Sequence, residues 1–186
     1  MGSTWDHPQL GRFKFVDGVW WTTIVDVPAF KAFAYDTGFS NAPRSTGKHK
    51  LAFQADDEAD APSPAAIALA SKVLANHAKL VAVVTHALWD DFNGRGPESG
   101  MWWRGDLAQV AEMMGADEPP TKADDLLALM QVSQITVRKD VDGMDEPVVE
   151  LSFHAEFDQE HGVGVLTDGD TVLGMGYSGE ATPFET

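Results

Sequence analysis

The sequence predicts a single α+β domain over residues 1–186, in which a mainly antiparallel sheet is formed by N- and C-terminal strands and about three helices are inserted between them. Runs rich in β-branched and aromatic residues fill the first and last thirds, whereas the middle third has apolar residues at helical spacing. Strands and helices that occupy separate parts of a chain favour this class over alternating β-α units. The 186 residues, 44% of them hydrophobic, suffice for one core.

The first third predicts a β-hairpin followed by a further strand. The runs 12–16 and 19–27 flank Asp17-Gly18, a dipeptide that favours a two-residue type I′ turn. Such a turn would pair Val16 with Val19. Residues 51–55 predict the next strand, before an acidic segment that ends at Pro62.

The middle third predicts one long helix and two short ones. Ser63 is a suitable N-cap for a helix from Pro64 to about Phe92, because its side chain can accept a backbone N–H of the first turn. Asp106 with Gln109 predicts the start of a short helix that ends at Gly115. A further short helix is expected over residues 121–130.

The last third returns to strands. Residues 132–138 and 148–157 predict two of them, and 163–167 with 171–177 predict a hairpin around the two-residue loop Asp168-Gly169. Alternation in the second strand places one set of residues toward the core and the other toward solvent. The expected solvent-facing set comprises Glu150, Ser152, His154 and Glu156.

Composition excludes several functions. The chain has 13 Lys+Arg against 29 Asp+Glu, a net charge of −16, which disfavours nucleic acid and anionic membranes and would attract a basic protein partner. A second explanation of this charge is an acidic or salt-adapted proteome, which would imply no partner. With 0 Cys, thiol chemistry and Cys-ligated metals are excluded. No signal peptide and no apolar run of about 18 residues is present, so a cytoplasmic location is expected.

Two tryptophans and an arginine make one candidate binding site. Trp102, Trp103 and Arg104 fall in a predicted loop, and Trp and Arg are enriched at binding hot spots. The alternative, which is favoured, is that the loop folds back and its aromatic residues join the core.

A second candidate site is a run of histidines and acids near residue 160. His154, Glu156, Asp158 and His161 could ligate Zn²⁺, Mn²⁺ or Fe²⁺, with Glu160 as a general base. The alternative is a polar turn in which Gly162 takes positive φ while Glu160 and His161 bind backbone groups. The spacing is not diagnostic of a metal site, and no phosphate loop, Ser elbow or other cofactor motif occurs, so no cofactor is expected.

The segment Phe153 to Val165 resembles a motif of a bacterial family of uncharacterised proteins. That motif is an aromatic-Asp pair followed by Glu-His-Gly-x-Gly-Val, here Phe157-Asp158-Gln159-Glu160-His161-Gly162-Val163-Gly164-Val165. Pro8 to Gly11, Val27-Pro28 and Ala87-Leu88 are similar as well. Some members resemble immunity proteins of toxin systems, and the family has no established catalytic residues to carry over.

These observations lead to two hypotheses. The first is an acidic cytoplasmic protein-binding domain without enzymatic activity, of which a toxin-immunity-like protein is one form, with Trp102, Trp103, Arg104, Glu160 and His161 as binding residues. The alternative is a metal-dependent hydrolase that uses the His154-Glu156-Asp158-His161 cluster. The sequence does not specify an oligomeric state.

Overall fold

The computed structural model describes residues 2–38 and 45–185. Within these residues one sheet of nine strands runs in chain order from β1 to β9, and every neighbouring pair is antiparallel except β4 and β5. The strands are β1 (Thr4–His7), β2 (Gly11–Val16), β3 (Trp20–Asp26), β4 (Lys48–Gln54), β5 (Met130–Arg138), β6 (Val148–Ala155), β7 (Asp158–Thr167), β8 (Val172–Gly176) and β9 (Thr182–Pro183).

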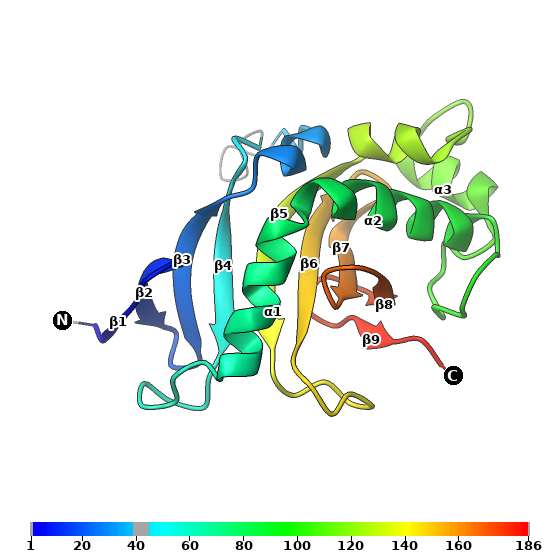
Figure 1. Ribbon diagram of the computed structural model, residues 1–186. Coiled ribbons are helices and arrows are strands. Elements are labelled where there is room, and N and C mark those ends of the chain that lie inside the picture. Colours follow the sequence, from blue (N-terminus) through cyan, green and yellow to red (C-terminus); the bar gives the residue numbers. More distant parts are fainter. Residues whose placement is uncertain (1, 39–44, 186) are drawn as a thin grey trace.

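The helices cover one face of this sheet (Figure 1). They are α1 (Pro64–Ala75), α2 (His77–Phe92) and α3 (Leu107–Met114), joined by two 3-10 helices, η1 (Pro28–Ala32) and η2 (Ala123–Ala128). Buried side chains of the sheet, such as Leu51, Ile135 and Leu151, belong to one hydrophobic cluster with Leu80 and Val84 of α2. The core therefore lies between the sheet and the α1–α2 pair.

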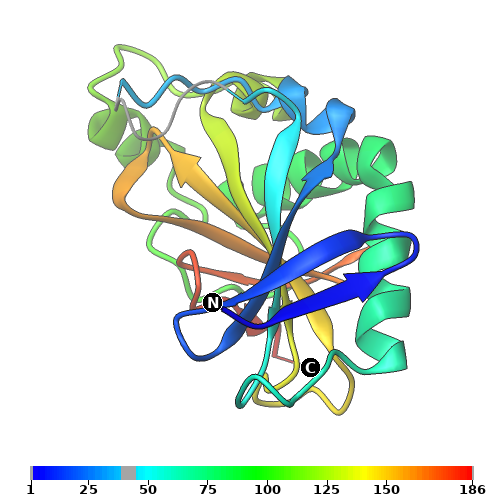
Figure 2. The same cartoon turned by 90° about the vertical axis from the view of Figure 1, so that its left-hand side faces the viewer.

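The sheet is strongly twisted. Figure 2 shows the hairpin of β1 and β2 crossing in front of the later strands at a steep angle, and Figure 1 places the two chain ends at opposite sides of the molecule. Strands of L-amino acids have a right-handed twist about their own axes, and this twist accumulates across a wide sheet.

The α+β class with a mostly antiparallel sheet is confirmed, and the sheet has more strands than the sequence predicted. Strands β1 and β9 were missed because they are short, four and two residues long, at the ends of the chain. The parallel pairing of β4 with β5 was also missed, and the three α-helices form the connection between these two strands.

The prediction of a single helix from Pro64 to Phe92 is wrong. The start is as expected, because Ser63 Oγ accepts the Ala66 N–H at 3.1 Å. The helix is broken at Asn76, where α1 and α2 meet at 85°. The Asn76 side chain donates to the Gly169 carbonyl at 2.9 Å, so the break is held by a tertiary contact that helical periodicity cannot reveal. No single described helix is long and apolar enough to cross a membrane, although this bent pair would meet the length and composition criteria together.

Both predicted hairpins form with a different register. Asp17 and Gly18 have the positive φ values of the expected turn, 53° and 74°, but Val16 pairs with Trp20 and not with Val19. In the last hairpin Thr167 pairs with Val172 across a longer loop. A turn dipeptide indicates where the chain reverses, whereas neighbouring strands decide the pairing.

The predicted strand 148–157 ends two residues early, at Ala155. The chain reverses at Glu156 and Phe157, and the Phe157 side chain is fully buried among core aromatic residues. Glu150 and Ser152, which were expected to face solvent, are buried, because the segment 178–181 lies over them.

This crossing of chain segments depends on glycines. A Cβ added to Gly164, Gly174 or Gly176 would come within 3.0 Å of atoms of segment 177–183. These residues permit the close backbone approach that larger side chains would prevent. The second face of the sheet is therefore partly covered by the chain's own C-terminal part and not by helices.

Candidate functional site

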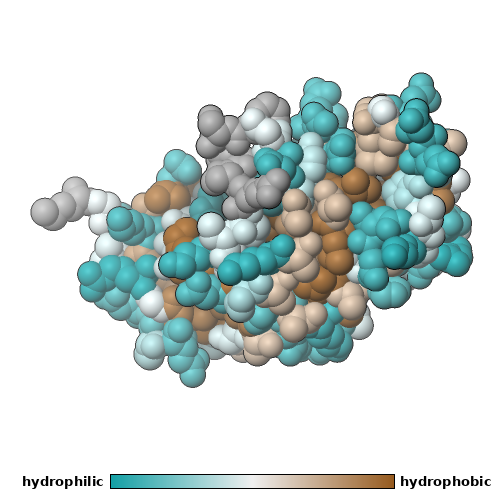
Figure 3. Space-filling view, turned by 90° about the horizontal axis from the view of Figure 1, so that it is seen from above, coloured by the Kyte–Doolittle hydropathy of each residue, from teal (hydrophilic) through white to brown (hydrophobic). Residues whose placement is uncertain are grey.

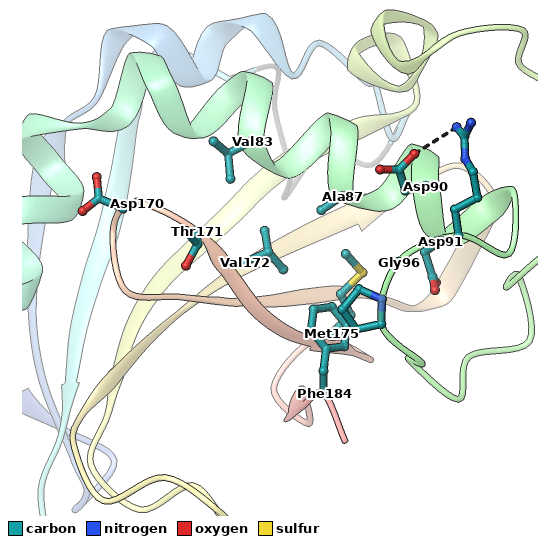
Figure 4. A pocket seen from close by; sticks show the side chains of 12 residues that line it. Val83, Ala87, Asp90, Asp91, Gly96, Asp170, Thr171, Val172, Met175 and Phe184 are labelled. Carbon is teal, nitrogen blue, oxygen red and sulfur yellow. Dashed lines mark ion pairs between the residues drawn. The ribbon is translucent and has the colours of Figure 1, made fainter. Parts of the chain in front are cut away.

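The clearest concave apolar site is a groove between α2 and β8 (Figure 4). Val83 and Ala87 of α2 point toward Val172 and Met175 of β8, and Phe184 closes the floor. The cavity has a volume of about 320 Å³. Its ends carry carboxylates, Asp170 at one and Asp90 with Asp91 at the other.

A second hollow adjoins the first at Phe184. It has a volume of about 860 Å³, and its apolar lining includes Met144, Leu173 and Pro183. Its rim adds three acidic residues, Glu98, Asp142 and Glu185. We define the two hollows together as the Phe184 groove.

Six of the seven charged residues that line the groove within the described parts of the chain are acidic, and four of these six form ion pairs, among them Asp91 and Glu98 with Arg104. Asp90 is paired with Arg95 at 2.9 Å, and Asp170 with Lys72 at 2.6 Å and Lys79 at 2.8 Å. Asp142 and Glu185 form no ion pair with any residue that the structure describes. Lys72 and Lys79 hold the pKa of Asp170 down at about 2, compared with an ordinary value of 3.8. The groove thus combines an apolar floor with an acidic rim.

Arg104 positions one wall of the groove. Its guanidinium donates to the carbonyl oxygens of Arg95, Gly96 and Pro97 at 2.8–3.2 Å, and its Nη1 lies 2.6 Å from Asp91 Oδ1. Asp91 is buried and also accepts the Trp103 indole N–H at 2.8 Å. The predicted binding residue Arg104 therefore lies behind the wall that contains Gly96 and Pro97.

The two adjacent tryptophans have different positions. Trp103 is fully buried against Phe92 and Phe157, so its ring cannot contact a partner in this conformation. Trp102 is half-buried, and its Nε1 donates to Asp158 Oδ2 at 3.0 Å. This loop folds back onto the core, as the favoured sequence interpretation stated.

The polar turn near residue 160 is organised by Asp158. Its buried carboxylate accepts the His161 backbone N–H at 3.0 Å and lies 3.2 Å from His161 Nδ1. The His161 ring also packs on Tyr177, with ring centroids 4.5 Å apart. Glu160, which was expected to bind the turn, is exposed, and its side chain forms no hydrogen bond with the described residues. The acidic partner of His161 is Asp158, three residues away, and not the adjacent Glu160.

The four residues of the metal hypothesis do not form a ligand cluster. The reversal at Glu156 and Phe157 ends the extended strand on which the hypothesis depended, and Asp158 pairs with Ala155. Across residues 2–38 and 45–185, no group of three or more His, Asp and Glu side chains is placed to hold a metal ion. Partial burial lowers the pKa of the His154 imidazole below its ordinary value.

Sequence reasoning missed the groove residues. Val83 and Ala87 are four residues apart and lie beside the core stripe formed by Leu80, Val84 and Leu88, so they are half-exposed. That second apolar stripe on α2 is the signal that could have indicated them. Met175 and Phe184 lie next to this stripe only because β8 and the C-terminal segment run beside α2 in the folded chain.

The fold and the groove define a mixed α+β domain with a broad, mainly antiparallel sheet and a lateral apolar groove. The chain belongs to the family described as Domain of unknown function (DUF6985), which matches residues 21–182. The match includes the segment from Phe153 to Val165 and excludes Pro8 to Gly11. Searches of curated proteins and of solved structures found no match.

Proposed function

We propose that this protein is a non-enzymatic binding domain that captures a basic polypeptide segment in the Phe184 groove. The observation that carries the proposal is an apolar floor of Val83, Ala87, Val172, Met175 and Phe184 beneath a rim of carboxylates. Apolar side chains in a desolvated pocket supply most of the affinity at protein interfaces, and rim charges set the rate and partner preference.

The surface as a whole supports a basic partner. The net charge of −16 would accelerate association with a cationic protein at low salt. The surface is not uniformly polar. Figure 3 shows an apolar stripe between polar clusters on the face seen from above. A toxin-immunity-like protein, as the sequence resemblance implies, would be one form of this activity, with the basic toxin as its partner.

The test uses short fluorescent peptides that carry Lys and Arg around one central position occupied by Leu, Met, Phe, Ala or Asp. We expect fluorescence anisotropy to show tighter binding for the large apolar residues, and weaker binding as salt rises from about 0.1 M to about 1 M. Ala87→Trp fills the groove and should weaken binding by about tenfold or more.

Ala82→Trp is the matched control, because Ala82 is exposed on α2 and does not line the groove. Replacing Asp142 and Glu185 by their amides should reduce the salt dependence, whereas replacing the exposed Asp117 and Glu118 by theirs should not. Equal binding to Ala87→Trp and Ala82→Trp, or no preference for an apolar central residue, would contradict the proposal.

A further inference from the structure

A second pocket lies on the face of the sheet that the helices leave open. It has a volume of about 230 Å³ and lies over β3, β5 and β6, on the opposite face from the core residues Leu51, Ile135 and Leu151. Segment 178–179 forms its other side. It shares no lining residue with the Phe184 groove, and its chemistry is different. Its lining comprises Trp20, Ser133, Gln134, Thr136, Arg138, Glu150, Ser152, Ser178 and Gly179.

An ion pair between Arg138 and the buried Glu150 forms part of the pocket lining. Glu150 is 1% exposed, and its Oε2 accepts a hydrogen bond from Arg138 Nη1 at 2.7 Å. Its Oε1 accepts from the Gly179 N–H and, at 3.2 Å, from Ser152 Oγ. Arg138 Nη1 also donates to the Ala181 carbonyl at 2.9 Å. Both oxygens of the carboxylate thus accept hydrogen bonds, and Arg138 Nη1 is held between Glu150 and Ala181.

Several hydrogen-bonding groups at the pocket surface have no protein partner. Among the described residues, the Nε and Nη2 groups of Arg138 and the hydroxyls of Ser133 and Ser178 have none. Gln134 uses its amide N–H₂ on Thr136 Oγ1 at 2.8 Å, which leaves its carbonyl oxygen as an acceptor. The Trp20 side chain is half-exposed beside them and offers an apolar surface. The lining therefore combines hydrogen-bond donors and acceptors with one aromatic ring.

The charges of the pocket and of the whole protein limit which ligands can bind here. The positive charge of Arg138 is balanced by Glu150, and the protein carries −16 overall, so an anion gains little here. A cation has no free carboxylate in the pocket to bind, because both Glu150 oxygens are engaged. The volume lies below the range of about 300–1,000 Å³ that is usual for drug-sized ligands. A small neutral molecule fits these constraints best.

We propose that this pocket binds a neutral cyclic polyol of monosaccharide size. Each hydroxyl of such a ligand can donate and accept, as the mixed lining requires. Its C–H face can lie against the Trp20 ring, which supplies contact area at low entropic cost. The buried Arg138–Glu150 pair keeps the polar groups in place before binding, which reduces the ordering cost of association.

The test is saturation-transfer NMR with the full chain and separate neutral polyols, namely glucose, galactose, mannose, N-acetylglucosamine and myo-inositol. Galacturonate and glucosamine serve as the anionic and cationic comparators. We expect transfer to at least one neutral polyol and weaker transfer to its charged counterpart. Transfer to none of the neutral polyols, or stronger transfer to a charged comparator, would overturn the proposal.

Variants then locate the site. Trp20→Ala and Gln134→Ala should each weaken the binding of the responding polyol by about tenfold or more. Ile24→Ala is the matched control, because Ile24 is 63% exposed on the same face of β3 and lies outside the pocket. If Trp20→Ala unfolds the chain, Gln134→Ala alone shows whether the polyol binds in this pocket. Unchanged binding in the folded pocket variants would overturn the proposal, and Ala87→Trp in the separate groove should leave polyol binding unaltered.

Discussion

Gly162 shows how one residue can be required by its surroundings. It has φ of +67° within β7, at the irregularity where Phe153 pairs with Val163 but Ala155 pairs with Asp158. A Cβ at this position would collide with the Phe153 carbonyl oxygen. Because that atom belongs to the backbone of the neighbouring strand, no side-chain rotation can relieve the collision.

We predict that Gly162→Ala lowers the free energy of unfolding by clearly more than about 1 kcal/mol. That figure is the cost of holding alanine at positive φ, and the collision adds to it. Gly179→Ala is the control, because Gly179 has φ of +85° but nothing within 4 Å of an added Cβ. Urea denaturation of both variants should give a larger loss for Gly162→Ala, and equal losses would refute a specific requirement at Gly162.

The polar turn also shows what adjacency in sequence can hide. Glu160 and His161 are neighbours, and both side chains were predicted to bind backbone groups of the turn, yet successive strand residues point to opposite sides. Asp158, three residues earlier, contacts the His161 ring and backbone at the irregularity in the pairing of β6 with β7. The backbone hydrogen bond of this turn is accepted by the Asp158 carboxylate, and not by the Glu160 side chain as the sequence predicted.

At the scale of elements, one aspartate joins three parts of the fold. Asp170, in the turn between β7 and β8, is paired with Lys72 of α1 and Lys79 of α2. Asn76 at the break between the helices donates to the same carboxylate at 3.2 Å. This set of contacts fixes the 85° angle together with the end of the Phe184 groove at which Asp170 lies.

Asp170 should make stability depend on acid pH. Its pKa of about 2 in the fold lies below the ordinary 3.8, so the stabilisation is complete above about pH 5 and is lost as pH falls through 3.8 toward 2. Asp170→Asn should therefore be less stable than the original chain near pH 7, and the difference should shrink toward pH 2.

Chemical denaturation at a series of pH values tests this prediction. Asp117→Asn is the control, because Asp117 is exposed and forms no ion pair with the described residues. The effect will be modest, because the Asp170 side chain is 40% exposed and solvent screens its pairs. A stability difference between Asp170→Asn and the original chain that stays constant from pH 7 to pH 2 would contradict the linkage.

At the scale of the whole molecule, the excess of acidic residues should oppose folding. A net charge of −16 brings like charges closer in the folded state than in the unfolded chain. Raising NaCl from about 0.1 M to about 1 M shortens the Debye length from about 10 Å to about 3 Å. We therefore predict a rise in melting temperature of about 2–4 °C, which corresponds to about 1 kcal/mol for a chain of this size.

Differential scanning calorimetry at pH 7 measures this rise. The same salt series near pH 4.5, the isoelectric point of the sequence, is the control, because the net charge there is close to zero. The rise should be smaller at that pH. A fall in melting temperature with salt at pH 7 would mean that surface ion pairs such as Arg12–Asp6 outweigh the general repulsion.

The sequence by itself determined the class of the fold and the local signals at its element ends. Ser63 and Asp106 cap helices as predicted, and Asp17-Gly18 reverses the chain, because these effects act within a few residues. Tertiary structure decided the break at Asn76, the registers of both hairpins and the burial of Glu150. It also decided which residues line the Phe184 groove and which line the pocket on the other face of the sheet. Each of these depends on groups far apart in the chain, such as Asn76 with Gly169 and Glu150 with Gly179, and local patterns carry no information about which distant segment will supply the partner.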